Sequence, residues 1–129
     1  MDTVKKINEE LAIAGQITLE DLQLLALEGY QSVVNLRSPD EDGYDATEEI
    51  STQLIGLVYY NLPTKLIDIN TSVILQLCQK ISELPKPALI HCDNAIRSIA
   101  VVLVYIATQQ GISLERAFQE AKKLGLLQS

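Results

Sequence analysis

Short apolar runs alternate with amphipathic stretches along the chain, and this alternation predicts strands interleaved with helices. Residues 11–15 (LAIAG) form a short apolar run that ends at glycine and predicts an edge strand. Residues 32–37 (SVVNLR) and 57–63 (LVYYNLP) predict two further strands, and residues 88–92 (ALIHC) predict a buried one. VVNL and ALIH lack polar alternation, so we expect helices to cover both faces of the sheet.

The stretches between these runs have helical spacing or helical length, and several carry start signals. Thr18 is a good N-cap with Asp21 in the capping-box position, Asn70 or Thr71 is expected to cap the third helix, and Ser113 is the N-cap of the last. In the second predicted helix, Ile50, Leu54 and Ile55 share one helical face. The predicted helices cover residues 18–29, 44–56, 70–84, 98–111 and 113–125.

This order of elements predicts an α/β fold. Strands that alternate with helices pair in parallel through right-handed crossovers. No repeat, low-complexity tract or linker interrupts the chain, so we expect residues 1–129 to form a single three-layer domain. Its central sheet is expected to have four to five mainly parallel strands flanked by helices. Ligands of such folds bind at the carboxyl ends of strands, where Cys92 is expected.

Composition supports a folded protein of the cell interior. The chain has 129 residues, of which 47% are hydrophobic and 21% charged, enough apolar side chains for a core. The longest unbroken apolar run, residues 99–107, is far shorter than the roughly 18 residues of a membrane span. No apolar signal segment follows the first lysines. These features predict a cytoplasmic protein with no membrane association.

Charge and cysteine content limit the ligands, the cofactors and the redox compartment that we expect. A formal net charge of −7 argues against general nucleic-acid binding, although a local cluster of N–H groups can still hold a small anion. Two cysteines are too few for a disulfide scaffold and indicate a reducing compartment. One histidine beside one cysteine does not supply four zinc ligands, so we expect neither a metal nor another cofactor.

The stretch ALIHCDNAIRS, residues 88–98, has residue types that suit nucleophilic catalysis, and they lie at a predicted turn from strand to helix. Unpaired N–H groups of such a turn, with the positive end of the helix, form a cradle for an anion. A cysteine at its mouth, Cys92, is favoured as the nucleophilic thiolate. The planar fork of Arg97 suits two oxygens of a tetrahedral anion, and Ser98 can donate a hydrogen bond to the sulfur.

HCDNAIRS is similar to the signature loop of cysteine-dependent phosphatases of the tyrosine and dual-specificity type. Four residues separate Cys92 from Arg97, whereas most of those enzymes have five. Four are found in the phosphatase-like domain related to beta-lactamase hydrolase-like proteins, and also in many rhodaneses. ITLEDLQLLALEGYQSVVNLR and GLVYYNLPT resemble the phosphatase-like family, over roughly residues 11–124. The Asp-x-Arg and Gly-His-Ile segments typical of rhodaneses are missing from the sequence.

The resemblance implies a mechanism without metal. Cys92 attacks phosphorus to form a phosphocysteine, which water then hydrolyses, and an aspartate protonates the leaving oxygen. We expect this aspartate to be Asp68, which follows the third predicted strand; Asp40, Glu41 and Asp42 are the alternatives at the same end of the sheet. The phosphoryl oxygens are expected to be held by Asp93, Asn94, Ala95, Ile96 and Arg97.

Other residues are assigned supporting or structural parts. His91 is expected to brace the loop, and Arg37 either guards the site or only ends a strand. Cys78 lies on an apolar helical face and is expected in the core, and Tyr59 and Tyr60 should face opposite sides of a strand.

Two residues depart from the family pattern. Ala95 stands where the family usually has glycine, and an alanine held at positive φ costs roughly 1 kcal/mol. Asp93 adds a negative charge at the rim of a site for anions. Three functions therefore remain open. The first is a phosphatase acting on a phosphate monoester, the second a rhodanese-type sulfurtransferase with a persulfide on Cys92, and the third a catalytically weak domain that binds phosphate or sulfate.

Overall fold

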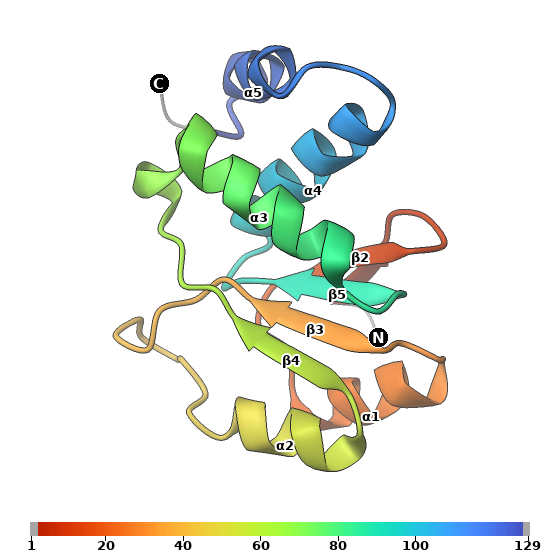
Figure 1. Cartoon of the computed structure of the whole chain (residues 1–129). Coiled ribbons are helices and arrows are strands. Elements are labelled where there is room, and N and C mark those ends of the chain that lie inside the picture. Colours follow the sequence, from red (N-terminus) through yellow and green to blue (C-terminus); the bar gives the residue numbers. More distant parts are fainter. Residues whose placement is uncertain (1–2, 128–129) are drawn as a thin grey trace.

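A computed structural model describes residues 3–127 as a five-stranded sheet between two layers of helices (Figure 1). The strands are β1 (Val4–Lys6), β2 (Leu11–Ala14), β3 (Ser32–Asn35), β4 (Val58–Asn61) and β5 (Ala88–His91). The helices are α1 (Leu19–Leu27), α2 (Glu48–Ile55), α3 (Thr71–Glu83), α4 (Ile96–Gln109) and α5 (Leu114–Lys123), with a short 3₁₀ turn η1 (Leu66–Asp68). The predicted α/β fold is confirmed. Residues 1, 2, 128 and 129 lie outside the described part.

The strand order is β1-β2-β5-β3-β4, with every pair parallel except β1 and β2. The prediction that residues 11–15 form an edge strand is wrong, because β1 pairs with the outer side of β2. β1 has the sequence VKK, with both lysines exposed, so it lacks the apolar signal that marks the other strands. Its lysines suit an edge strand, since charged edges discourage pairing with other chains.

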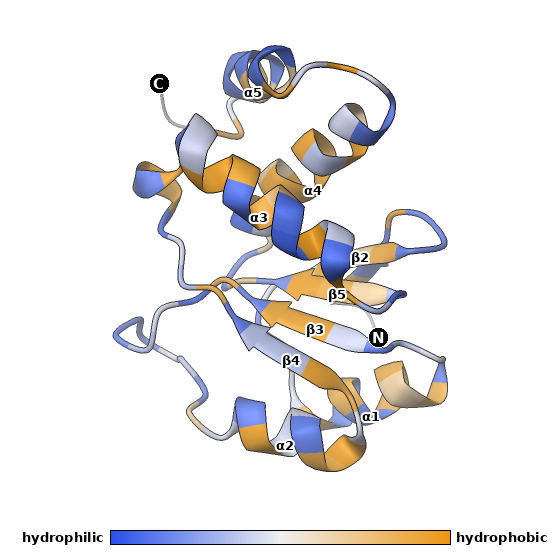
Figure 2. Ribbon diagram, in the orientation of Figure 1, coloured by the Kyte–Doolittle hydropathy of each residue, from blue (hydrophilic) through white to orange (hydrophobic). Residues whose placement is uncertain are grey.

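Two apolar cores lie on opposite faces of the sheet. α1 and α2 cover one face, while α3, α4 and α5 cover the other (Figure 1). The central strands are strongly apolar (Figure 2), and α1, α3, α4 and α5 bury mainly apolar residues against the cores. Tyr59 lies in one core and Tyr60 packs against the other, as predicted. Within residues 3–127, no helix combines the length and apolarity needed to cross a membrane.

Helix starts follow the predicted caps. The Thr18 side chain accepts a hydrogen bond from the backbone N–H of Asp21, and the Asp21 carboxylate accepts one from the Thr18 N–H. The side chains of Asn70 and Ser113 accept hydrogen bonds in the first turns of α3 and α5. Each cap satisfies an N–H group that the helix itself leaves unpaired.

The buried face of α2 differs from the predicted one. Ile50 and Leu54 are 59% and 82% exposed, and of the three apolar residues only Ile55 packs against a core. The buried residues of α2 are instead Glu48 and Thr52. Apolar periodicity could not reveal this orientation, because the partners of Glu48 come from other strands.

Candidate active site

Cys92 lies directly after β5, the strand with one parallel neighbour on each side. Its backbone N–H donates to the carbonyl of Ala14 at the end of β2, at 3.2 Å. The carbonyl of His91 accepts the N–H of Leu36, just past β3, at 2.9 Å. Both neighbouring strands therefore hold the chain where it leaves the sheet and enters the loop toward α4.

The loop reaches α4 through a left-handed residue. Ala95 has φ 72° and ψ −9°, and it is the only described non-glycine residue with positive φ. The Cβ atom makes this conformation cost roughly 1 kcal/mol, as expected from the alanine in this position. Helix α4 then begins at Ile96, which places Arg97 in its first turn.

Side chains of the loop occupy part of the predicted anion cradle. The N–H of Asn94 donates to Asp93 Oδ1 at 2.8 Å, and the N–H of Ile96 donates to Asn94 Oδ1 at 3.1 Å. Two N–H groups that we expected to face an anion are therefore already bonded. An incoming phosphoryl group must replace these side-chain oxygens to use them.

The sulfur of Cys92 is enclosed. Ser98 Oγ donates to Cys92 Sγ at 3.4 Å, as predicted, and both residues have 0% exposure. The expectation that Cys92 sits at the mouth of the loop is therefore wrong for this conformation. Ser98 of α4 and the core under α3, α4 and α5 enclose the sulfur, so a substrate can reach it only after the loop or its neighbours move.

Arg97 is held by two carboxylates. Its Nη1 and Nη2 donate to the two oxygens of Glu41, each at 2.8 Å, and Nη2 also donates to Asp93 Oδ1 at 2.9 Å. The carbonyl of Thr64 accepts from Nη1 at 3.0 Å. The predicted fork is thus present but occupied, because all four terminal N–H groups have protein acceptors.

These contacts shift the ionisation of the carboxylates. The hydrogen bond from Arg97 lowers the pKa of Glu41 to about 2, although partial burial opposes the shift. Burial alone would raise the pKa of Asp93, but the hydrogen bond and charge of Arg97 outweigh it and leave that pKa lowered. The hydrogen bond with Glu41 raises the pKa of Arg97. Both carboxylates are therefore negatively charged at neutral pH.

Arg37 has a structural part. It is buried, and its guanidinium donates to the side chains of Gln16 at 2.7 Å and Glu41 at 3.3 Å, and to the backbone carbonyls of Asp42 and Gly43. These bonds fold the acidic loop after β3 so that Glu41 faces Arg97. The sequence left open whether Arg37 guards the site or only ends a strand. The geometry favours a third role, in which Arg37 holds this loop in place.

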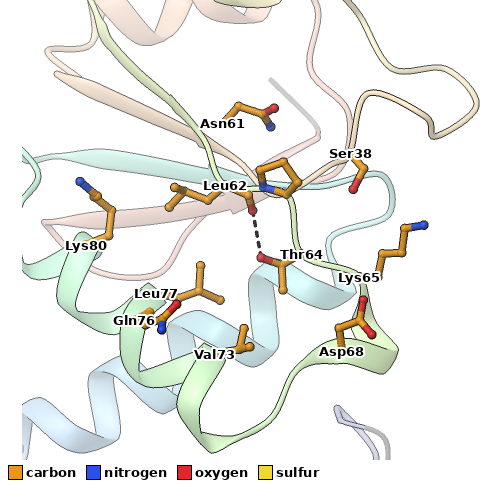
Figure 3. Close-up of a pocket in the computed structure, with 11 residues that line it drawn as sticks. Ser38, Asn61, Leu62, Thr64, Lys65, Asp68, Val73, Gln76, Leu77 and Lys80 are labelled. Carbon is orange, nitrogen blue, oxygen red and sulfur yellow. Dashed lines mark hydrogen bonds between the residues drawn. The ribbon is translucent and has the colours of Figure 1, made fainter.

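One hollow lies beside Arg97, and a second, larger hollow shares Lys65 with it. The first, of about 280 Å³, is lined by Glu41, Lys65, Leu66, Asp93, Asn94, Ile96 and Arg97. The other, of about 580 Å³, has apolar walls from Leu62, Pro63, Val73 and Leu77, and Lys65 lines both (Figure 3). Asp68, in η1, lines the larger hollow close to Lys65 (Figure 3). Asp68 makes no side-chain hydrogen bond to the Cys92 loop among residues 3–127.

Two contacts behind the loop were not found from the sequence. His91 Nε2 lies 2.6 Å from Glu48 Oε2, and both side chains are buried. At Gly15 a Cβ atom would lie 2.8 Å from the carbonyl oxygen of Asp93, so only glycine lets the loop approach β2 so closely. In the sequence, Gly15 after the apolar run was the available signal for this close approach. A glycine that simply ends a strand explained the pattern equally well.

Cys78 has no part in the site. It lies on the buried face of α3, in the core, as predicted, and burial raises the pKa of its thiol to about 11. Such a thiol is poorly nucleophilic at neutral pH, since the thiolate is the reactive form.

Comparison with known proteins gives a family and a fold. A family model described as the phosphatase-like domain of beta-lactamase hydrolase-like protein matches residues 3–110. The beta-lactamase hydrolase-like protein of Xylella fastidiosa (strain Temecula1) is 32% identical over 97 residues, which cover 72% of this chain and 22% of the relative. The chain thus spans less than a quarter of the length of that relative.

Solved structures of phosphatases share the fold. TpbA of P. aeruginosa, in complex with pTyr, has a TM-score of 0.70 at 16% identity, covering 96% of this chain and 74% of that one. The core catalytic domain of the PP-IP phosphatase SIW14 from S. cerevisiae, in complex with citrate, has a TM-score of 0.69 at 20% identity, covering 94% and 74%. The predicted resemblance to cysteine phosphatases is confirmed.

Proposed function

Because the chain belongs to the family of beta-lactamase hydrolase-like phosphatase-like domains, we propose that it hydrolyses phosphate monoesters through a phosphocysteine intermediate. One observation carries the proposal. Cys92, Arg97 and Ser98 lie together where β5 turns into α4, with Ser98 Oγ 3.4 Å from the sulfur and the Arg97 guanidinium on the same loop. A nucleophile, a cation for the phosphoryl oxygens and a donor to the leaving thiolate are the parts this reaction needs.

In the first step, the thiolate of Cys92 attacks phosphorus. The S–P bond forms, the bond from phosphorus to the ester oxygen breaks, and the leaving oxygen takes a proton. Asp68 is our candidate donor, because η1 follows β4 at the end of the sheet where Cys92 leaves β5, and Leu66 of η1 lines the hollow beside Arg97. Arg97 balances the charge of the phosphoryl oxygens throughout this step.

In the second step, water attacks the phosphocysteine. Asp68 accepts a proton from the water, the S–P bond breaks, and inorganic phosphate leaves while the sulfur returns to a thiolate. Ser98 stabilises this thiolate through its hydroxyl group, whose oxygen lies 3.4 Å from Sγ. His91 braces the loop from behind, through Nδ1, which lies 3.4 Å from the carbonyl oxygen of Cys92.

Substrate entry requires Asp93 to move. Its side chain is 48% exposed, so it can turn outward into water and release Arg97 Nη2 and the N–H of Asn94. Glu41 is only 18% exposed and is held by Arg37 and the N–H of Ser38. We therefore expect Glu41 to stay bound to Arg97 and Asp93 to be the group that phosphate displaces.

The enclosed sulfur favours a second candidate. Cys92 has no exposed surface, and carboxylates occupy Arg97, an arrangement that also suits a domain that binds anions weakly without turning them over. In this alternative, phosphate displaces Asp93, but Cys92 never bonds to phosphorus.

Hydrolysis of p-nitrophenyl phosphate by the protein and by Cys92→Ser tests the proposal. We expect the substitution to lower kcat by about a thousandfold or more, because it removes the nucleophile. Binding of inorganic phosphate, measured as a rise in Tm, should persist in Cys92→Ser. Cys78→Ser is the matched control, since it changes the other buried cysteine and should keep most of the activity.

Three other results would support a different function or a different nucleophile. Phosphate-dependent stabilisation with no turnover by the unsubstituted protein would support the anion-binding domain. Thiocyanate formed from thiosulfate and cyanide, and lost in Cys92→Ser, would support a sulfurtransferase. Equal turnover by Cys92→Ser and the unsubstituted protein would rule out Cys92 as the nucleophile.

A further inference from the structure

Glu48 is a buried carboxylate at the start of α2 that neither the family resemblance nor the proposed reaction uses. It is 1% exposed and accepts three hydrogen bonds. Gln16 Nε2 donates to Oε1 at 2.8 Å, while Tyr59 OH at 3.0 Å and His91 Nε2 at 2.6 Å share Oε2. A carboxylate out of water with this many donors is held in one orientation, because losing any donor leaves a buried oxygen unpaired.

One arm of this arrangement leads to the nucleophile. The contact with Glu48 Oε2 makes Nε2 of His91 an N–H donor, since the carboxylate can only accept. The opposite nitrogen, Nδ1, lies 3.4 Å from the carbonyl oxygen of Cys92. The imidazole therefore packs between Glu48 and the backbone of Cys92, and its bond to Glu48 fixes the plane of the ring.

The second arm leads to the guanidinium. Gln16 turns its Nε2 to Glu48 and its Oε1 to Arg37 Nη1, at 2.8 and 2.7 Å. Arg37 Nε then donates to Glu41 at 3.3 Å, and Glu41 holds both terminal nitrogens of Arg97 at 2.8 Å. The chain of contacts from Glu48 thus reaches both functional groups of the Cys92 loop by separate routes.

We propose that Glu48 is a positioning residue that orients Cys92 through His91 and Arg97 through Gln16, Arg37 and Glu41. The inference rests on the proposed function only for its effect on turnover. Its structural part, the control of Cys92 and Arg97 by one carboxylate, holds whether or not the protein is a phosphatase. The buried position also explains why α2 turns a polar residue inward and leaves Ile50 and Leu54 exposed.

Alkylation of Cys92 by iodoacetamide, followed across pH and located by peptide mass spectrometry, tests the first arm without any turnover. Glu48→Gln keeps the shape of the side chain but replaces one oxygen with an NH₂ group, which cannot accept. We expect the pH profile of Cys92 alkylation to shift and the Tm rise with inorganic phosphate to shrink. If the protein is a phosphatase, kcat should fall about 10- to 100-fold with less change in KM.

Two further variants separate positioning from general stability. Ser32→Ala removes another fully buried polar side chain, which donates to the carbonyl of Pro85 far from the loop. It should lower Tm while leaving the alkylation profile unchanged. Gln16→Leu breaks the second arm at its first contact and also removes the donor to Glu48 Oε1, so it should weaken phosphate binding.

The outcomes decide the inference. A folded Glu48→Gln with an unchanged alkylation profile and unchanged phosphate stabilisation would overturn it. If Glu48→Gln does not fold, Gln16→Leu still decides, because unchanged phosphate binding in that variant would refute the second arm. Absence of turnover in every variant would contradict the proposed function, while the alkylation and phosphate-binding results would still test Glu48.

Discussion

Asp93 competes with an incoming anion for Arg97, because one of its oxygens accepts from both Nη2 of Arg97 and the N–H of Asn94. A phosphoryl oxygen would use the same two donors. The motif identified this residue as an unfavourable charge at the rim, but it could not show that the carboxylate folds back onto the loop. Rotamers of single residues depend on neighbours that local sequence does not specify.

Asp93→Asn should therefore tighten phosphate binding. The amide has a weaker acceptor and no charge, so phosphate displaces it more easily, and we expect about a fivefold lower Kd. The Tm rise at increasing phosphate concentration measures this change. Glu9→Gln is the control, since Glu9, between β1 and β2, forms an exposed pair with Lys6 and lines neither hollow. Weaker binding by Asp93→Asn would mean that the carboxylate organises the site rather than competing in it.

At the scale of elements, the sequence was sufficient for most of the fold. Apolar runs located β2 to β5, and the caps at Thr18, Asn70 and Ser113 located helix starts. The apolar pattern did not reveal β1, because β1 pairs with β2 through backbone groups and leaves its lysines exposed. The pattern also gave the wrong buried face for α2. The orientation of α2 depends on a hydrogen bond between Glu48 and His91, 43 positions apart, which helical periodicity cannot contain.

The loop between β3 and α2 places Glu41 against Arg97 of α4. We expect this contact to make the free energy of unfolding depend on pH in the acidic range. The pKa of Glu41 is about 2 in the folded protein, below its ordinary value of 4.5. Because the folded pKa is depressed, its contribution to the free energy of unfolding is complete above about pH 4.5 and is lost as pH falls toward 2. Urea unfolding of the protein and of Glu41→Gln at several pH values measures this contribution.

At pH 6 we expect Glu41→Gln to be less stable by about 1–2 kcal/mol, and the difference should narrow between pH 4.5 and 2. Glu9→Gln serves again as the control, because Glu9 forms only an exposed pair with Lys6. If the free energies of unfolding of Glu41→Gln and the unsubstituted protein differ by the same amount across this range, the charge of Glu41 does not stabilise the folded protein through Arg97.

At the scale of the whole molecule, the charge opposes the chemistry that we propose. The net charge is −7, and Glu41 and Asp93 both line the hollow beside Arg97. An anionic substrate therefore meets a repulsive field before it reaches the single cation of the loop. The screening length falls from about 30 Å at 0.01 M salt to about 8 Å at 0.15 M, so salt should remove most of this repulsion.

Alkylation of Cys92 by anionic iodoacetate and by neutral iodoacetamide measures this field directly. We expect the ratio of the iodoacetate rate to the iodoacetamide rate to rise about two- to fivefold between 10 and 150 mM NaCl. The neutral reagent is the internal control for any change in access to the sulfur. A ratio that falls with salt would show instead that Arg97 dominates the field at the loop and attracts anions.

The complete burial of Cys92 has a consequence for redox chemistry. A thiolate in a phosphate-type site is a ready target for peroxide, which converts it to sulfenic and then to irreversible sulfinic acid. Here Ser98, α4 and the sheet leave no path for an oxidant to the sulfur in the resting state. The motion that admits a substrate also admits peroxide, so the cysteine is vulnerable to oxidation only while the loop is open.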